Sequence, residues 1–352
     1  METFGKEIVR MEHVYKDFPG VQALDDMSLV VHEGEVHALV GENGAGKSTL
    51  IKILMGVFSM SSGSIYIEGT SVEIRNPIDA QTLGLSAVYQ DITIARDLTV
   101  AENFFLGRLP RTSLGLVDWK RICLDTQKVL DELNIQVKAS SLVRTLSVAK
   151  QEMVLIAKQY FQHSKLIVFD EPTALLSNEE VKELFSIIRK LKREGVASIY
   201  ISHRLEELFE LCDTVTVMKD GKLSACLSIL DTDEEELISK MVGRTVEDMY
   251  SITHTEPKEE VLRVDHLTRK QVFEDISFSL HKGEVFGIFG LVGSGRTEIV
   301  RSIYGADSYD SGSIFLNGKK TVLKNPSQAI SQGVGLLPED RKHQGLTLDT
   351  SV

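Results

Sequence analysis

The chain has 352 residues, with 39 Lys and Arg against 51 Asp and Glu, so its formal net charge is −12. This length suggests about two domains, and 42% hydrophobic residues are typical of a soluble chain with well-packed cores. The acidic balance argues against a nucleic-acid-binding protein, because neutralising phosphates requires surplus Lys and Arg. We expect neither a secretory signal nor a membrane span, since no run approaches the ~20 apolar residues that cross a bilayer.

The first predicted elements are a strand at 36–40, a glycine-rich loop and a helix at 47–55. The loop fits the pattern G-x-x-x-x-G-K-[ST] in the strand–loop–helix context that it requires. Its backbone N–H groups would turn toward a phosphate, and the helix N-terminus would add positive potential. Lys47 would reach the terminal phosphates, and the Ser48 hydroxyl would bind Mg²⁺. The pattern predicts a nucleoside triphosphate site made of Gly41, Glu42, Asn43, Gly44, Ala45, Gly46, Lys47, Ser48 and Thr49.

Further along the chain, strands and helices alternate. Residues 64–67 and 72–74 are predicted to form a small antiparallel piece, and the apolar runs 166–169 and 198–201 are typical of strands covered on both faces. A helical pattern spans 178–193, with Asn178 as its expected N-cap. This order predicts an α/β unit with a mostly parallel core.

Two adjacent carboxylates end the apolar run at 166–169. Downstream of a phosphate-binding loop, Asp170 is expected to hold Mg²⁺. Glu171 is expected to act on the attacking water as a general base. An acidic pair at a strand end is often only a helix cap, but the preceding loop favours the functional interpretation.

The chain contains an internal repeat. Gly34-Glu35-Val36 recurs as Gly283-Glu284-Val285, 249 residues later, whereas Glu12-His13 matches Asp265-His266 at an offset of 253. The second copy is therefore four residues shorter near its start. We predict a complete domain at 7–245, an acidic linker at 246–260, and an incomplete second copy at 261–352. The offset of 249 also relates Lys47 to Arg296, Ser62–Ile65 to Ser311–Ile314, and Asn76-Pro77 to Asn325-Pro326.

The ordered motifs resemble those of ABC-transporter nucleotide-binding domains. Leu146-Ser147 lies upstream of the Asp-Glu strand, and Ser202-His203 follows the next strand. The duplicated layout is similar to the two-domain ATPase subunits of bacterial monosaccharide importers of the ribose, galactose or autoinducer type. The segments that carry this resemblance include Phe18-Pro19-Gly20-Val21, Val242-Gly243-Arg244 and Pro338-Glu339-Asp340-Arg341-Lys342. The resemblance implies a P-loop NTPase fold with a mixed sheet core, an antiparallel β piece and a helical subdomain, duplicated with an incomplete second copy.

The resemblance also implies roles for single residues. Phe18 would stack on adenine, although a core aromatic in a turn is the alternative. Gln90 would sense Mg²⁺ and the attacking water, His203 would hold the γ-phosphate, and Ser147 would contact nucleotide bound by an opposite domain. Residues 91–160 would dock on a membrane partner, and the loop Ala174–Ser177 would cross the dimer interface. The implied ligands of Mg²⁺ are Ser48, Gln90 and Asp170.

Two departures from the family pattern bear on activity. Val148, Ala149 and Lys150 stand where the family signature has Gly-Gly-Gln after Leu-Ser, and side chains there are expected to weaken a close backbone contact. The second loop has Arg296 for Lys, and Glu298 stands where Thr49 does. Glu339 likewise stands where Gln90 does. In a head-to-tail pair the two weakened elements face each other, and the partner of the intact loop would lie beyond residue 352.

The sequence-based hypothesis is an ATP-binding and ATP-hydrolysing subunit of a sugar-type ABC importer, with ATP and Mg²⁺ as its ligands. Integral-membrane permease subunits would be its partners, with a periplasmic sugar-binding protein contacted indirectly, and its place would be peripheral, on the cytoplasmic face of the membrane. Turnover would need the missing part of the second domain or a homodimer. The alternatives are a truncated ATP-binding fragment without turnover and, ranked lower, a soluble non-transport ABC ATPase.

Overall fold

The computed structural model describes residues 5–89, 94–174, 176–242, 259–291, 293–338, 344–345, 347 and 350. The chain divides into two compact units, Met1–Tyr250 and Ser251–Val352. None of the helices in these described ranges combines the length and apolar character needed to cross a membrane. The predicted domain boundary at 245 lies outside the described residues, whereas the one at 261 lies within the described strand Glu260–Arg269. Both boundaries stay predictions.

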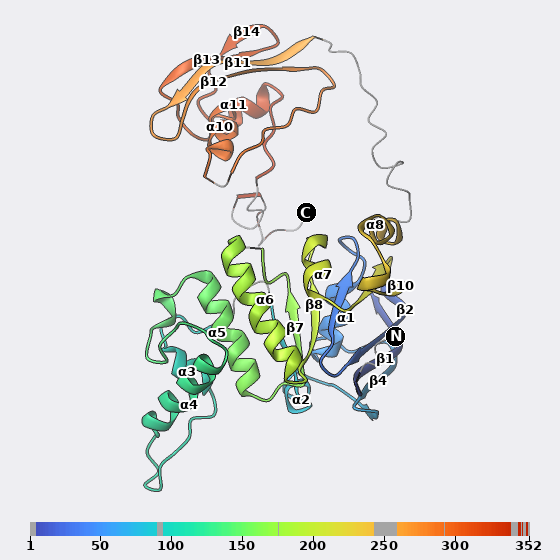
Figure 1. The fold of residues 1–352 in the computed structure, drawn as a ribbon. Helices are drawn as coiled ribbons and strands as arrows, with labels where there is room; N and C mark the ends of the chain where they lie inside the picture. The colour runs from blue at the N-terminus through green and yellow to red at the C-terminus, as the bar shows by residue number, and fades with distance from the viewer. Residues whose placement is uncertain are drawn as a thin grey trace. The chain divides into compact units, whose positions relative to one another are not determined.

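A six-stranded sheet forms the centre of the first unit (Figure 1). Five of its strands are parallel and the sixth pairs antiparallel at one edge, which confirms the predicted mixed sheet. A strand covered on both faces can be apolar throughout, and the two central strands are buried along their whole length. The order is β10 (Lys222–Ser228), β9 (Thr214–Lys219), β3 (Val36–Val40), β8 (Ala197–Ile201), β7 (Leu166–Asp170) and β6 (Leu85–Val88).

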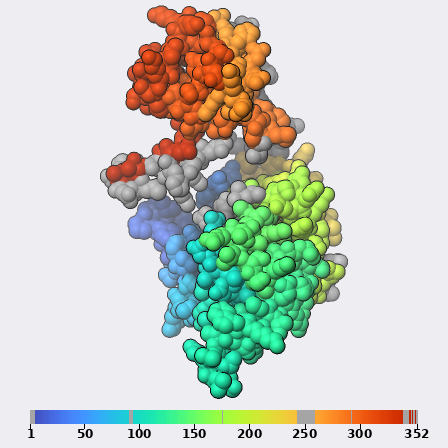
Figure 2. Space-filling view, turned by 90° about the vertical axis from the view of Figure 1, so that its left-hand side faces the viewer, coloured from blue at the N-terminus to red at the C-terminus, as the bar shows by residue number. Residues whose placement is uncertain are grey.

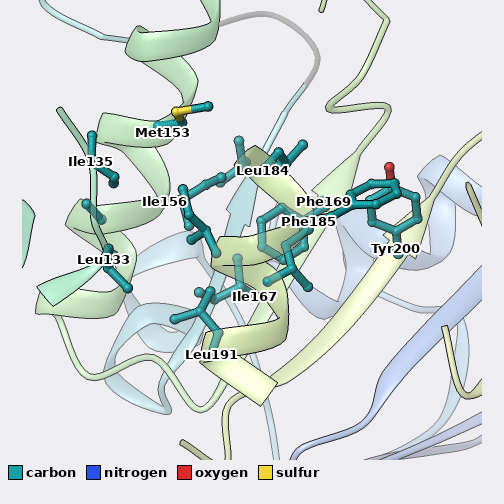
Figure 3. Close-up of a cluster of buried hydrophobic side chains, with 14 of the residues drawn as sticks. Leu133, Ile135, Met153, Ile156, Ile167, Phe169, Leu184, Phe185, Leu191 and Tyr200 are labelled. Atoms are coloured by element: carbon teal, nitrogen blue, oxygen red, sulfur yellow. The ribbon is translucent and has the colours of Figure 1, made fainter. Parts of the chain in front are cut away.

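Helices cover one face of this sheet and enclose the larger core. Phe185 packs edge-on against Tyr200, with ring centroids 6.2 Å apart, and Phe169 lies 6.5 Å from the same ring. Figure 3 shows these rings beside aliphatic side chains from two neighbouring helices. The helices on this side include α3 (Val100–Phe104), α4 (Trp119–Glu132), α5 (Val148–Phe161) and α6 (Asn178–Arg193), with the 3₁₀ turn η1 (Val143–Thr145) before α5. The helices between 94 and 161 correspond to the predicted helical subdomain.

The opposite face of the sheet packs on α1 (Lys47–Leu54) and on a four-stranded antiparallel sheet. Alternate residues of the central strands point into the two cores: Ala38 enters the helical side and Leu39 the other. The antiparallel sheet has the order β2 (Val21–His32), β1 (Glu7–Phe18), β4 (Ser62–Ile67) and β5 (Thr70–Val72). The remaining elements of the unit are α2 (Pro77–Thr82), α7 (Leu205–Leu211), η2 (Ile229–Asp231) and α8 (Glu234–Val242).

Two local predictions were wrong. The N-cap of α6 is Ser177 and not Asn178, because the Ser177 hydroxyl accepts from the backbone N–H of Glu180 while the Glu180 carboxylate accepts from the Ser177 N–H. The strand placed at 72–74 lies instead at Thr70–Val72. Glu68 and Gly69, with φ of +50° and +80°, form a tight turn that starts the returning strand at once.

The second unit repeats the start of the first. Its sheet has the order β12 (Phe273–His281), β11 (Glu260–Arg269), β13 (Ser311–Leu316) and β14 (Lys319–Thr321), with helices α10 (Arg296–Ile303) and α11 (Pro326–Ser331). Both helices and the last two strands lie 249 residues after α1, α2, β4 and β5, residue for residue. The shorter β11–β12 hairpin accounts for the four missing residues, among them the counterpart of Phe18. The structure thus confirms the repeat.

The counterpart of β3 is not a strand in the described part of the second unit. Residues 284–290 have no assigned secondary structure, and Val285 and Phe289 are both 99% exposed. In the first unit β3 lies between β8 and β9, which bury it from both sides. Among the described residues of the second unit, no strand pairs with the apolar segment 284–290.

The capping box of α6 gives a test of the fold. Replacing Ser177 by Ala removes one hydrogen bond to an otherwise free N–H, so we expect Ser177→Ala to lower the free energy of unfolding by about 1 kcal/mol. The measurement is urea unfolding of the full chain followed by far-UV circular dichroism. Ser228→Ala is the matched control, because Ser228 precedes η2 in a similar backbone conformation without a side-chain cap. Equal losses in the two variants would contradict the capping assignment.

Candidate functional site

The loop between β3 and α1 fits tightly against neighbouring strands at two of its glycines. A Cβ on Gly41 would lie 2.3 Å from the Met218 carbonyl oxygen, and a Cβ on Gly46 would lie 2.7 Å from the Ala23 carbonyl oxygen. Gly46 also has φ of +101°, a conformation that side-chain-bearing residues rarely adopt. Both positions therefore need glycine, and the loop is pressed against the body of the first unit before any ligand binds.

Lys47 is the first residue of α1 and is buried. Its Nζ donates to the carbonyl oxygens of Gly41 (2.6 Å) and Glu42 (3.1 Å), so the ammonium group lies under the loop. Burial lowers the pKa of Lys47, while the nearby carboxylates of Glu171 and Asp170 raise it. The lysine and the two carboxylates therefore share one electrostatic environment, as the sequence analysis predicts.

The carboxylates lie at the end of β7, beside β8. Burial raises the pKa of Asp170, and the Glu171 carboxylate raises it further. Glu171 has φ of +52° and donates its N–H to the Ile201 carbonyl oxygen at 3.0 Å. Its Oε1 lies 2.8 Å from His203 Nε2, an ion pair when the imidazole is protonated. The structure thus brings the predicted general base and the predicted histidine into direct contact.

A buried glutamate joins the loops that carry these two residues. Glu207 of α7 is 5% exposed, and its Oε1 lies 2.9 Å from the Arg204 guanidinium. One oxygen, Oε2, accepts three hydroxyl hydrogen bonds: from Thr173 (2.9 Å), Tyr200 (2.8 Å) and Ser202 (2.7 Å). Thr173 follows the base in sequence and Ser202 precedes the histidine. This carboxylate therefore fixes both loops to the same point, a role that the sequence analysis missed.

The loop, the carboxylates and the histidine line one open cavity of about 410 Å³. Its outer wall comes from the start of β2, where Val21 is exposed, and from the turn Asp220-Gly221 between β9 and β10. Gly221 donates its N–H to the Ala45 carbonyl oxygen at 3.1 Å, which ties this turn to the loop. An Asp-Gly pair in the sequence indicates a turn. That this turn lies beside the loop before α1 follows only from the order of the strands in the sheet. The wall residues absent from the sequence prediction are Val21, Gln22, Ala23, Ile201, Asp220 and Gly221.

Four predicted site residues in the described part of the chain are not among the residues that line this cavity: Phe18, Gly41, Glu42 and Ser147. Phe18, at the end of β1, packs edge-on against Phe58 with ring centroids 5.4 Å apart, and Lys16 Nζ lies 5.0 Å from its ring centroid. Phe18 is not among the cavity's lining residues, so its stacking on adenine stays a prediction. Gln90 lies outside the described residues, and so does Glu339, its counterpart in the second copy.

Ser147 lies at the N-cap of α5 and is exposed. Its hydroxyl accepts from the Lys150 N–H at 3.3 Å, while Val148 and Lys150 project from the first turn as exposed side chains. The helix N-terminus is thus available at the surface, but it carries side chains where the family pattern has glycines. Its contact with a nucleotide on another domain stays a prediction.

The second loop keeps a local conformation similar to that of the first. Gly295, with φ of +88°, precedes α10 as Gly46 precedes α1, and Arg296 is the first helical residue. Glu298 lies in the first turn of α10, where Thr49 lies in α1. A carboxylate in this turn disfavours a polyphosphate, so the local chemistry agrees with the expectation of a weakened site.

The chemistry of the first cavity fits a magnesium ion. Ser48 is exposed at the start of α1, Asp170 is half-buried at the end of β7, and both line the same cavity. Hydroxyl and carboxylate oxygens are ligands that Mg²⁺ prefers. Because burial and Glu171 both raise the pKa of Asp170, a cation at this point would favour its charged form.

Comparison with known proteins agrees with this geometry. A family model described as ABC transporter matches residues 24–174 and 273–350. A ribose import ATP-binding protein of Streptomyces avermitilis is 46% identical over 346 residues, which are 98% of this chain and 66% of that protein. One of Bacillus licheniformis is 43% identical over 98% of this chain and 70% of that protein. A solved ATP-binding cassette of an ABC transporter in its ADP conformation has a TM-score of 0.60 and 25% identity, covering 68% of this chain and 99% of that one. The predicted fold class is confirmed.

A buried carboxyl one turn after Ser147 predicts a pH dependence of stability. Burial of Glu152 raises its pKa from 4.5 to about 7, so the folded chain binds this proton more tightly than the unfolded chain. The resulting contribution to stability is complete below pH 4.5 and is lost as the pH rises toward 7. We expect Glu152→Gln to raise the free energy of unfolding at pH 8 by roughly 2 kcal/mol. We also expect the free energy of unfolding of this variant to fall less steeply between pH 4.5 and pH 8.

Urea unfolding of the full chain at a series of pH values measures this effect. Glu179→Gln is the control, since Glu179 is exposed in the first turn of α6. A Glu152→Gln curve parallel to that of the unsubstituted chain would show that the carboxyl does not titrate in this range.

Proposed function

Because this chain belongs to the ABC transporter family, we propose that it binds MgATP at the end of β3 and hydrolyses it to energise a sugar-type importer. The observation that carries the proposal is the convergence of three separate elements on one cavity: the loop before α1, the end of β7 and the end of β8. Both relatives described above are ribose import ATP-binding proteins that match 98% of this chain, which supports carbohydrate as the cargo.

Binding begins with the phosphates. The glycine-rich loop and the N-terminus of α1 supply N–H groups and positive potential, and the buried Lys47 adds a full charge close to the carboxylates. Ser48 and Asp170 would hold Mg²⁺, together with Gln90 as the family resemblance implies. A bound Mg²⁺ would offset the charge of the phosphates. Lys47 would then donate to phosphate oxygens in place of the Gly41 and Glu42 carbonyls.

Glu171 is the proposed general base, and His203 orients it. The 2.8 Å contact between their side chains holds the Glu171 carboxylate toward the cavity, where it would accept a proton from the attacking water. A γ-phosphate would compete with Glu171 for His203, so nucleotide binding would release the carboxylate at the moment when a water molecule needs it. Glu207 keeps both loops in register during this exchange.

Other subunits would complete the transport complex. Permease subunits would contact the helical region within 91–160, a periplasmic sugar-binding protein would act indirectly, and the subunit would be peripheral on the cytoplasmic face of the membrane. Ser147 of a second copy would complete the site across a homodimer. The alternative of ATP binding without turnover, and the lower-ranked soluble ABC ATPase, are distinguished by the measurements below.

The two loops of the repeat provide a matched test of nucleotide binding. We expect Lys47→Ala to weaken MgATP binding about ten- to a hundredfold, because it removes the charged donor to the phosphates. Arg296→Ala, at the equivalent position of the second loop, is expected to leave the affinity of the first site unchanged. Isothermal titration calorimetry on the full chain measures both. Similar losses in the two variants would place the nucleotide elsewhere.

Turnover is tested by MgATP hydrolysis over a wide range of protein concentrations. A homodimeric site predicts a specific activity that rises with concentration, and Glu171→Gln is expected to lower it by a factor of about 10² to 10⁴ while retaining ATP binding. Glu179→Gln, an exposed carboxylate of α6, is the control. Flat background activity despite ATP binding would favour the alternative without turnover. Activity untouched by Glu171→Gln would contradict the assigned base.

A further inference from the structure

Residues 106–121, between α3 and the first turn of α4, form a segment that reaches away from the first unit (Figures 1 and 2). Its shape is set by backbone hydrogen bonds. Thr112 donates to the Leu116 carbonyl oxygen at 2.8 Å, and Asp118 donates to the Pro110 carbonyl oxygen at 2.9 Å. Arg111 adds a bond from Nη1 to the Gly115 carbonyl oxygen at 2.8 Å. The segment is therefore a closed hairpin with a defined surface.

This 106–121 segment exposes an unusual group of apolar side chains. Leu114 and Leu116, near its turn, are 85% and 68% exposed. Trp119, the only tryptophan of the chain, is 51% exposed at the start of α4. Leu106 and Leu109 are exposed on the stretch that leads into the turn. Single exposed apolar residues are ordinary, but a projecting element that carries five of them is typical of an interaction site.

The same segment is basic, although the chain as a whole is strongly acidic. It holds four basic residues, Arg108, Arg111, Lys120 and Arg121, and one acidic residue, Asp118. All four basic side chains are exposed, while Asp118 caps α4 by accepting from a backbone N–H. The segment thus has a net charge of +3, and the rest of the chain has −15. An anionic surface would attract this segment and repel the remainder of the molecule.

We propose that the 106–121 segment binds the surface of an anionic phospholipid bilayer. Leucine side chains would enter the boundary between headgroups and acyl chains, Trp119 would lie at headgroup depth, and the Arg and Lys side chains would contact phosphates. The net charge of +3 on a segment of a chain that otherwise carries −15 is the observation that favours an anionic bilayer as the occupant. This contact goes beyond the proposed ATPase function and does not depend on it.

The test uses the full chain without nucleotide and two kinds of vesicle: phosphatidylcholine alone, and equal parts of phosphatidylcholine and phosphatidylglycerol. Because Trp119 is the only tryptophan, its emission reports on this segment alone. We expect a blue shift, quenching by brominated acyl chains, and at least about tenfold tighter binding to the anionic vesicles. Raising the salt concentration is expected to weaken the binding.

Two comparisons of a test variant with a matched control variant distinguish binding through this segment from non-specific adsorption to the vesicles. Lys120→Gln with Arg121→Gln is expected to weaken vesicle binding about tenfold, whereas Lys319→Gln with Lys320→Gln, an exposed basic pair of the second unit, is expected to have no effect. Leu114→Ser with Leu116→Ser is expected to abolish the blue shift, and Leu230→Ser, equally exposed elsewhere, is expected to retain it. All these side chains are exposed, so the variants should keep the circular dichroism spectrum of the unsubstituted chain.

Three outcomes would overturn the proposal. They are unchanged Trp119 emission with both kinds of vesicle, equal affinity for neutral and anionic vesicles, and equal losses in the test and control pairs. The first outcome would leave a protein partner as the occupant of the segment. None of them bears on ATP binding or hydrolysis, which are measured separately.

Discussion

The site depends on the complete burial of one short strand, β3. All five of its residues are buried, β8 pairs with it on one side and β9 on the other, and its side chains enter both cores of the first unit. Such a strand cannot shift without disturbing two hydrophobic cores at once. The loop that leaves its end is therefore held in place, with Gly41 pressed against the Met218 carbonyl of the neighbouring β9. The fold thus fixes the position of the loop that is proposed to bind phosphates.

The other end of β3 is fixed by buried charge. Burial alone would raise the pKa of Glu35, but hydrogen bonds from His37, at 2.7 Å, and from the His32 backbone N–H outweigh it and lower the pKa to about 2. Asp213 accepts from the Val36 N–H at 2.9 Å. A carboxylate network therefore anchors the start of the strand, while its end presents N–H groups and Lys47. Charged groups of opposite sign therefore lie near the two ends of β3. The carboxylates at its start hold the strand in place, and the Lys47 ammonium group beyond its end is proposed to bind the ligand.

The residues predictable from the sequence are those whose chemistry lies in a short contiguous pattern. Lys47, Asp170 and Glu171 all line the cavity, because a loop or a strand end is encoded within a few residues. The roles of Glu207 and Val21 were missed, because they depend on which strands become neighbours. The N-cap at Ser177 could have been predicted from the sequence, since Ser177 and Glu180 have the spacing of a capping box. The sequence thus predicted the cavity-lining residues of short motifs better than the residues whose place depends on the order of strands in the sheet.

Comparing the two copies of the repeat shows which elements form from nearby residues and which need residues from distant parts of the chain. Each copy forms its antiparallel sheet and its loop-following helix, since turns, caps and hairpins need only nearby residues. The last two strands and the helix have the same boundaries in both copies, and only the first hairpin is shorter in the second. A parallel strand needs partners from distant parts of the chain, and the second copy lacks them among its described residues. The nearest atoms to a Cβ on Gly290 belong to Ser294 and Arg296, within its own loop and helix, whereas a Cβ on Gly41 would lie 2.3 Å from a carbonyl oxygen of another strand. A glycine-rich motif therefore specifies the local turn, and it is the buried sheet that holds this turn against its neighbours in the first unit.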